Sequence, residues 1–229
     1  MIENSDFETF LYISKSKYQI FVYDKNNLKN LYNEKIENND ELELNILSKF
    51  LDDHIYKIEK MIKNFIRNII LIVEDDKILD TVISFKKKNY DKKKYQKHLE
   101  NTLVEVKDIF RENYQDQTIM HMIVLDNDKN ENNLLINNDD DDYLFLEVNF
   151  ISITNNLTFY FDKLLAIHQI EIKKYMSGKY IKSYFTEDQT ELSVIANKLN
   201  NGLNNKEVKI VSKNVKNKGF FEKFFQLFN

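Results

Sequence analysis

The residue types that most often do chemistry are scattered along this 229-residue chain. The four histidines fall on separate predicted elements, and no two have the spacing of a metal-binding pair: His54, His98, His121 and His168. Ser14, Ser16 and Ser84 have no histidine close by in the sequence and no glycine-built turn to hold an oxyanion. The sequence therefore predicts no nucleophilic catalysis. It also favours histidines at the surface or at the edge of the core.

Acidic residues gather where an ion-binding loop could lie. Asp126-x-Asp128-x-Asn130 opens like a calcium-binding loop, but Glu131 and Asn137 stand at its sixth and twelfth positions. Such loops require glycine at the sixth position and a bidentate glutamate at the twelfth. The four consecutive aspartates at 139–142 are typical of a solvated loop. We therefore expect no metal ion.

Glycine is almost absent from the chain, which limits how it could bind phosphate. The three glycines, Gly178, Gly202 and Gly219, are isolated, and there is no proline. Phosphate-binding loops such as G-x-G-x-x-G and the Walker loop need several glycines so that the backbone can approach the ligand. The sequence therefore predicts no cofactor and no enzyme activity.

Lysines form the sharpest charged cluster. Lys86-Lys87-Lys88 and Lys92-Lys93-Lys94 enclose Tyr90, and Tyr95 follows them. We interpret this cluster as a solvated loop, with an acidic or nucleic-acid partner as the alternative. The whole chain carries a net charge of -4, from 33 basic and 37 acidic residues, so no overall basic field attracts nucleic acid.

Composition indicates a folded protein. Hydrophobic residues make up 42% and charged residues 31% of the chain, as in globular domains. There is no cysteine, which excludes disulfides and favours the cytoplasm. Residues 1–10 contain no apolar segment typical of a signal peptide, and no apolar run reaches the ~20 residues that span a bilayer.

Hydrophobic periodicity predicts a mixed α/β (α+β) fold. β-Forming residues predict a hairpin at 7–14 and 18–24 with a third strand at 28–36, and helical spacing predicts a long helix from Asn39 or Asp40 to about Ile66. The remaining elements are strands at 69–73 and 78–85, a helix at 91–114, strands at 118–125 and 143–153, a helix from Asn155 or Asn156, weaker strands at 170–174 and 180–185, a helix capped by Thr186, and a strand at 208–211. The acidic residues at 74–76 fall in the tight turn after the 69–73 strand.

The last residues of the sequence form an amphipathic pattern. Wound as a helix, residues 220–228 place their apolar side chains on one side: Phe220, Phe221, Phe224, Phe225, Leu227 and Phe228. Lys216, Lys218 and Lys223 can meet anionic headgroups, and a polar linker over 212–218 precedes the helix. We predict that this segment binds a membrane surface weakly and reversibly, like other interfacial helices. The alternative is that it packs on its own domain.

Three regions together resemble FtsA, the actin-like protein that tethers the bacterial division ring to the membrane. The first is Leu11-Tyr12-Ile13-Ser14-Lys15-Ser16-Lys17 with the strand after it, which is similar to the family's phosphate turn D-I-G-[ST]-[ST]-K. The stretch 68–171 resembles the family's inserted strand–helix–strand subdomain, and the terminal amphipathic segment resembles its membrane-targeting helix. The resemblance implies a shortened, partial actin-like fold of about half the family's length.

The phosphate motif departs from the family pattern. Tyr12 stands where the family has aspartate and Ser14 where it has glycine, so that Tyr12, Ser14, Ser16 and Lys17 form a degenerate motif. The resemblance therefore implies tethering and assembly without ATP binding.

The resemblance also implies a division of the chain and a role for it. Residues 1–66 would form a partial actin-like segment, 67–142 the inserted subdomain, 143–211 the remaining actin-like elements, and 212–229 the linker and membrane helix. The implied function is a non-enzymatic cell-division adaptor on the inner face of the cytoplasmic membrane. Its implied partners are anionic lipid, division-ring (FtsZ-type) or other divisome proteins at the septum, and itself, but no nucleic acid. The alternatives are a degenerate actin-like ATPase and a soluble interaction module.

Overall fold

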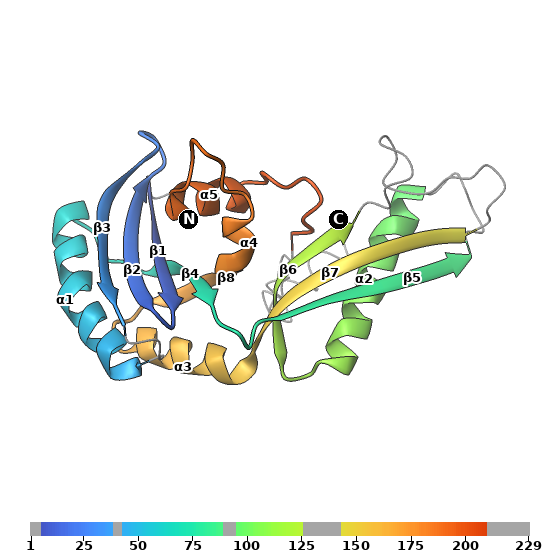
Figure 1. Cartoon of the computed structure of the whole chain (residues 1–229), viewed down its shortest axis with the longest axis horizontal. Helices are drawn as coiled ribbons and strands as arrows, with labels where there is room; N and C mark the ends of the chain where they lie inside the picture. The colour runs from blue at the N-terminus through green and yellow to red at the C-terminus, as the bar shows by residue number, and fades with distance from the viewer. Residues whose placement is uncertain (1–5, 39–42, 89–94, 126–142, 210–229) are drawn as a thin grey trace, which may run out of the picture.

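The computed structural model describes residues 6–38, 43–88, 95–125 and 143–209, which form two sheets and five helices (Figure 1). The strands are β1 Phe7–Ser14, β2 Lys17–Asp24, β3 Lys29–Glu37, β4 Asn68–Glu74, β5 Leu79–Lys88, β6 Gln117–Leu125, β7 Tyr143–Thr154 and β8 Glu171–Ser177. The helices are α1 Leu44–Ile62, α2 Tyr95–Asn113, α3 Asn155–Ala166, α4 Gly178–Lys182 and α5 Leu192–Asn200. The mixed α/β class predicted from the sequence is confirmed.

The larger sheet has the strand order β3-β2-β1-β4-β8. β2 runs antiparallel to both β1 and β3, whereas β1, β4 and β8 run parallel to one another. A tight turn at 14–17 joins β1 to β2. In the next turn the Asp24 carboxylate accepts the backbone N–H groups of Asn26 and Asn27. β2 is therefore the only strand of the larger sheet that runs against the others.

Helices cover the larger sheet on both faces, so the protein has three layers there. Leu11 and Ile13 of β1 face a core shared with α1 and α3, whereas Phe10 and Tyr12 face a core shared with α4 and α5. Residues Ile69 to Val73 of β4 are all buried, as expected of a strand covered on both faces. A continuous apolar run is therefore typical of an interior strand, and β4 is such a strand.

The smaller sheet is inserted between β4 and α3 and has the order β5-β7-β6, antiparallel throughout. β5 and β7 form a long ribbon that extends away from the larger sheet, with α2 along one face (Figure 1). Val106 and Phe110 of α2 pack there against Val148 and Phe150 of β7. The two sheets meet where β6 contacts β8.

The sheets divide the chain at places other than the expected boundaries. β4, placed in the expected 67–142 subdomain, belongs to the larger sheet, whereas β7, placed after it, completes the smaller one. The inserted unit visible in the structure is therefore β5-α2-β6-β7. The domain boundaries themselves remain a prediction.

Two local predictions near the end of the described chain are wrong. The segment 180–185, predicted as a strand, contains most of helix α4, because the Ser177 hydroxyl accepts the Tyr180 N–H and caps a helix there. Thr186 does not cap a helix: its N–H and C=O both pair with Gln189 in a tight turn, and α5 begins at Leu192. Of the strand predicted at 208–211, only residues 208 and 209 lie within the described residues.

Two fully buried serines predict opposite effects of the same substitution. Ser193 in α5 is 0% exposed and its hydroxyl has no hydrogen-bond partner, whereas the Ser177 hydroxyl caps α4. Ser193→Ala should raise the free energy of unfolding by about 0.5–1 kcal/mol, because it removes an unpaired buried polar group and adds helix propensity. Ser177→Ala should lower it by about 1 kcal/mol, because it removes a helix cap. Urea denaturation of the two variants measures both effects, and equal losses in both would contradict this account.

Candidate functional site

The sequence-predicted residues fall into two groups in the structure. The membrane-binding residues of the terminal segment, 216–228, lie outside the described residues. Tyr12, Ser14, Ser16 and Lys17 lie together, at the end of β1 and in the turn to β2. The structure therefore places the degenerate phosphate motif at one edge of the larger sheet.

That edge is where the three parallel strands end side by side. Ser14 of β1 pairs in register with Glu74 of β4, and Val73 of β4 pairs with Ser177 of β8. In open α/β sheets, ligands bind in the crevice beyond the carboxyl ends of such strands. This edge is therefore the first place to look for a ligand site, and we call it the strand-end edge.

Side chains of this chain fill the strand-end edge. The Tyr12 hydroxyl donates to Glu74 Oε2 at 2.8 Å, and Lys182 Nζ lies 2.6 Å from the same oxygen and 3.2 Å from the Tyr12 hydroxyl. A Cβ at Gly178 would come within 2.9 Å of Glu74 Oε2, so only glycine allows α4 to approach this closely. The centre of the edge is therefore occupied by a closed cluster of four residues: Tyr12, Glu74, Lys182 and Gly178.

The charges in the cluster stabilise one another. Burial raises the pKa of the Tyr12 hydroxyl, which therefore remains a protonated donor. Burial on its own lowers the pKa of Lys182, but the hydrogen bonds to Glu74 and Tyr12 outweigh it and raise the pKa above its usual value. The lysine is thus fully charged and already paired with a carboxylate. A lysine held in this way is poorly available to neutralise a phosphate.

The turn after β1 also satisfies its own polar groups. The Ser14 hydroxyl accepts the Lys17 N–H at 3.0 Å and lies 3.1 Å from the Lys17 carbonyl oxygen, to which it donates. Lys15 forms an ion pair with Asp76 at 2.5 Å, and the Lys17 amine lies 5.3 Å from the centre of the Tyr12 ring. The hydroxyl and amines of the degenerate motif therefore contact protein groups.

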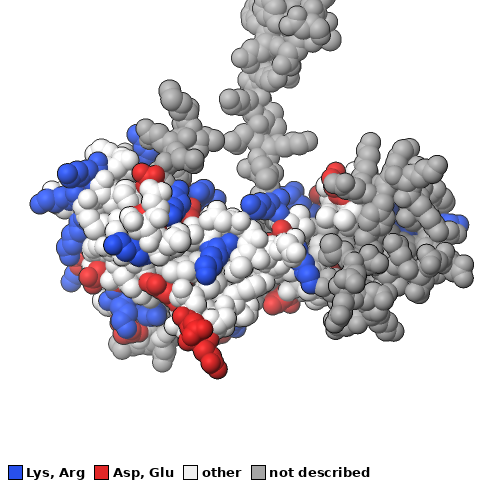
Figure 2. All heavy atoms as spheres, turned by 90° about the horizontal axis from the view of Figure 1, so that it is seen from above, with Lys and Arg blue, Asp and Glu red and all other residues white. Residues whose placement is uncertain are grey.

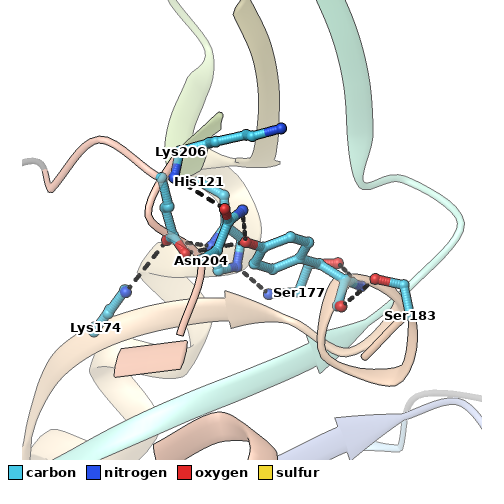
Figure 3. A network of polar contacts seen from close by, with 8 residues as sticks. His121, Lys174, Ser177, Ser183, Asn204 and Lys206 are labelled. Atoms are coloured by element: carbon cyan, nitrogen blue, oxygen red, sulfur yellow. Dashed lines mark hydrogen bonds and ion pairs between the residues drawn. The ribbon is translucent and has the colours of Figure 1, made fainter. Parts of the chain in front are cut away.

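A second polar network lies where the two sheets meet (Figure 3). His121 of β6 is 1% exposed; its Nδ1 lies 2.8 Å from Glu207 Oε1, and its Nε2 accepts the Ser177 N–H at 3.0 Å. Because Nε2 is an acceptor, Nδ1 carries the proton and donates it to Glu207. The neutral imidazole thus joins β6, β8 and the segment that contains Glu207.

Further contacts hold Glu207 in this network. Its carboxylate accepts the Tyr180 hydroxyl at 3.1 Å and lies 3.6 Å from Lys174 Nζ. Burial by itself raises the pKa of Glu207, but its hydrogen bond with His121 and the charge of Lys174 reverse the effect, and the pKa lies below its usual value. Burial lowers the pKa of His121. An ionised glutamate beside a neutral histidine is the state that this geometry supports.

This network fixes the last described segment against β6. The Val124 N–H donates to the Lys206 carbonyl at 3.0 Å, and the Val208 N–H donates to the Met122 carbonyl at 2.8 Å. We call residues 204–209 the strap. The strap is therefore held against β6 at the end of the described residues.

Sequence reasoning missed this network almost entirely. His121 was expected at the surface or the core edge, and Glu207 was not considered, because 86 residues separate the two. The apolar strand segment T-I-M-H-M-I-V-L around His121 is the sequence signal that could have indicated burial, but it does not identify the partner.

The other clusters considered from the sequence stay apart in the described part of the chain. Lys87 pairs with Glu105 of α2 at 2.5 Å, so this lysine braces α2 against the smaller sheet. Among the described residues, no three histidine, aspartate or glutamate side chains gather as a metal site. None of the described helices is both long and apolar enough to cross a bilayer. Residues 126–142, with the calcium-like loop and the aspartate run, lie outside the description.

Comparisons with known proteins give remote structural likenesses. No protein-family model and no curated protein matches the chain. It is similar to the cytoplasmic domain of EpsL, an inner-membrane component of the type II secretion system of Vibrio cholerae, with 7% identity and a TM-score of 0.38 over 75% of this chain and 57% of that one. It is also similar to a Bacteroides thetaiotaomicron protein described as having an actin-like ATPase fold and unknown function, with 12% identity and a TM-score of 0.33 over 80% of this chain and 58% of that one. The chain thus spans less than two thirds of each, and the function proposed below rests on its own residues.

The His121 network predicts that acid destabilises the protein. An unfolded imidazole titrates near a pKa of about 6.5, and burial places the folded pKa lower. When the pH falls below about 6.5, the imidazole takes up a proton in the unfolded chain more readily than in the folded protein. The contribution of His121 to stability is therefore complete above pH ~6.5 and is lost below it. His54, whose pKa burial also lowers, acts in the same direction. The urea concentration at the unfolding midpoint should therefore decrease as the pH is lowered from 7.5 to 5.5.

A substituted protein isolates the contribution of His121. His121→Asn should lower stability at pH 7.5 by about 1–3 kcal/mol, because Glu207 and the Ser177 N–H lose a buried partner. It should also weaken the dependence on pH, since asparagine does not titrate. If the substituted protein lost as much stability between pH 7.5 and 5.5 as the parent, His121 would not be the group responsible.

Proposed function

We propose that this protein is a non-catalytic, membrane-associated adaptor, in which a body with an eroded nucleotide site carries a terminal membrane-binding helix. The observation that carries the proposal is the cluster of Tyr12, Glu74 and Lys182 at the strand-end edge. The residues of this edge bond to each other at the place where a bound nucleotide would need phosphate contacts. The body therefore acts through its surfaces.

Electrostatics supports this interpretation of the edge. A nucleotide phosphate brings negative charge, and Glu74 would lie next to it at the strand-end edge. To bind there, the phosphate would have to separate Lys182 from Glu74 and displace the Tyr12 ring. Each step breaks a hydrogen bond or ion pair without an obvious replacement, because nothing at this edge forms a glycine-rich cradle.

The membrane part of the proposal rests on residues 212–229. Six apolar side chains at helical spacing, five of them phenylalanine, form one side of the helix that this sequence predicts. Lysines near an anionic bilayer contribute on the order of 1 kcal/mol each, so a single copy would bind weakly. Several copies on one scaffold would bind far more tightly through their combined effective concentration.

The cell-division role rests on the resemblance to FtsA. The β5-α2-β6-β7 unit inserted between β4 and α3 supports it, because the resemblance implies an inserted strand–helix–strand subdomain within 68–171. The proposal places the protein on the inner face of the cytoplasmic membrane, bound to division-ring or divisome proteins through its α/β body. Self-assembly on the membrane is a second expectation.

The charges on the face in Figure 2 support protein partners rather than nucleic acid. On the face in Figure 2, basic side chains lie at several separate places with acidic ones between them. Nucleic-acid binding would require a continuous basic surface.

The membrane proposal predicts the effect of charge in the terminal segment. Phe221→Glu with Phe225→Glu should abolish flotation of the full chain with vesicles that contain anionic lipid, because both side chains belong to the apolar side. Glu222→Gln with Gln226→Glu, which keeps the net charge and changes the opposite side, is the matched control and should still float. Persistent flotation of the Phe221 and Phe225 variant would contradict the anchor.

The eroded site predicts that nucleotide does not stabilise the protein. A ligand that binds only the folded state must raise the melting temperature, by an amount that grows with ligand concentration. ATP with magnesium should therefore leave the thermal unfolding midpoint unchanged. A rise that grows with ATP concentration and disappears in Lys182→Met would support the degenerate ATPase instead.

A further inference from the structure

β5 is an edge strand of the smaller sheet. It pairs with β7 along its whole length, from Leu79 opposite Ser152 to Lys88 opposite Tyr143, and the register has no shift. The order β5-β7-β6 leaves its other side without a neighbouring strand among the described residues (Figure 1). Alternate N–H and C=O groups along that side therefore point away from the sheet, in the arrangement that a further strand needs.

The other edges of the two sheets are protected. The strap pairs with the outer side of β6, through its hydrogen bonds with Met122 and Val124. In the pairing of β3 with β2 the register shifts next to Tyr23, as a β-bulge would cause, and at the end of β8 the Ser177 N–H donates to His121. Natural proteins use covers and bulges to stop edge strands from pairing with another chain. In the described part of the chain, β5 has neither.

The sequence of β5 is complementary to itself. In an antiparallel pair with two-fold symmetry about Ile83, each residue lies opposite the one that is equally far on the other side of Ile83 in the second copy. Asp80 then lies opposite Lys86, Thr81 lies opposite Phe85, and Ile83 lies opposite its own copy. Cross-strand pairs of opposite charge, and of β-branched with aromatic residues, stabilise a sheet. The symmetry makes the first two pairs occur twice.

Charge restricts the register of such a pair. Asp80 is the one acidic residue of β5, and only the symmetric registers centred on Ile83 or Ser84 place a lysine opposite it. Centred on Ser84, that lysine would be Lys88, the last residue of the strand. Centred on Ile83, it is Lys86, which lies within the strand. A lysine ammonium has three N–H donors, so this contact does not require Lys86 to give up another.

We propose that β5 pairs with β5 of a second copy of this chain, antiparallel and centred on Ile83. The two smaller sheets then form one continuous sheet with three strands from each copy, in the order β6-β7-β5-β5-β7-β6. The inference rests on the proposed function, since it names the surface through which the adaptor would self-assemble. Two copies joined in this way also carry two terminal segments, which would bind a bilayer more tightly than one.

Exchange of the two charges tests the contact. Because each copy contributes one strand, we expect a dissociation constant of about 10–100 µM, so sedimentation equilibrium of the full-length chain without lipid should show the dimer at several times that concentration. Asp80→Lys and Lys86→Asp should each weaken the dimer about tenfold, because like charges then lie opposite each other. Combining both substitutions should restore it, because the same pairs form with reversed charges.

Asp80 and Lys86 are exposed in the folded chain, so these variants should fold. Glu112→Lys, at an exposed position of α2, makes the same change of charge as Asp80→Lys and is the matched control. It should leave the dimer unchanged.

Single cysteines give a second, geometric readout, because the chain has none of its own. Directly opposite residues of an antiparallel pair have Cα atoms about 4.5–5.5 Å apart, which a disulfide can span. Ile83→Cys should therefore form a disulfide-linked dimer under mild oxidation, visible by non-reducing electrophoresis. Val82→Cys is the control and should stay monomeric, because Val82 lies opposite Ser84 and its own copy is about 7 Å further along the neighbouring strand.

A parent chain that stays monomeric throughout this concentration range would overturn the inference. So would a charge-exchanged variant that is no more dimeric than the single variants, or cross-linking through residue 82 but not through residue 83. These measurements contain no lipid, so they are independent of the anchor. If the dimer forms but no version floats with vesicles, the β5 contact stands and the membrane proposal fails. If every version floats but none dimerises, the β5 contact is wrong and the anchor stands.

Discussion

Burial of β4 on both faces is the constraint on which the rest of the structure depends. Each fully buried aliphatic side chain in the run Ile69–Val73 contributes about 1.5–3 kcal/mol relative to exposure, so the run is stable only if both faces are covered. Parallel β1 and β8 flank β4, α1 and α3 cover one face, and α4 and α5 cover the other. This arrangement brings three strands to an end at one edge.

The side chains at that edge are the basis of the proposal that the protein does not bind nucleotide. The same backbone arrangement would suit a phosphate if small residues let it approach. Here Tyr12 and Glu74 occupy the space, Lys182 neutralises the carboxylate, and Gly178 lets α4 close over them. The edge has thus become a cross-link between β1, β4 and α4. Such a cross-link holds these three elements in fixed positions relative to one another.

Those surfaces are fixed relative to one another by His121. The smaller sheet extends from the body, and its contact with β8 depends on a neutral imidazole between the Ser177 N–H and the Glu207 carboxylate. The same network holds the strap against β6. The inserted sheet, the larger sheet and the strap therefore form one mechanical unit. In the adaptor that we propose, such a unit would keep each binding surface in its orientation while the others are engaged.

The sequence by itself determined most elements and their faces. β-Forming residues identified the hairpin, a continuous apolar run identified the 69–73 strand, and helical spacing identified the three longest helices, because each pattern depends on residues that are near one another in the chain. It also determined that residues 12–17 depart from a phosphate loop, since that depends only on residue identity. The errors at Tyr180 and Thr186 arose where a cap and a tight turn, set by single hydrogen bonds, outweighed propensity.

Only the tertiary structure decided which distant residues meet. Tyr12 and Lys182 are 170 positions apart, and His121 and Glu207 are 86 apart, so no local pattern could pair them. The sheet order made these pairs by placing β4 between β1 and β8 and by setting β6 beside β8. Likewise, the loop between α1 and β4 and the turn between α3 and β8 line one groove, because they lie at the same end of the sheet although they are far apart in sequence. Local interactions depend on residues that are neighbours in the sequence. These sites depend instead on how distant segments pack, and packing is determined by the whole chain.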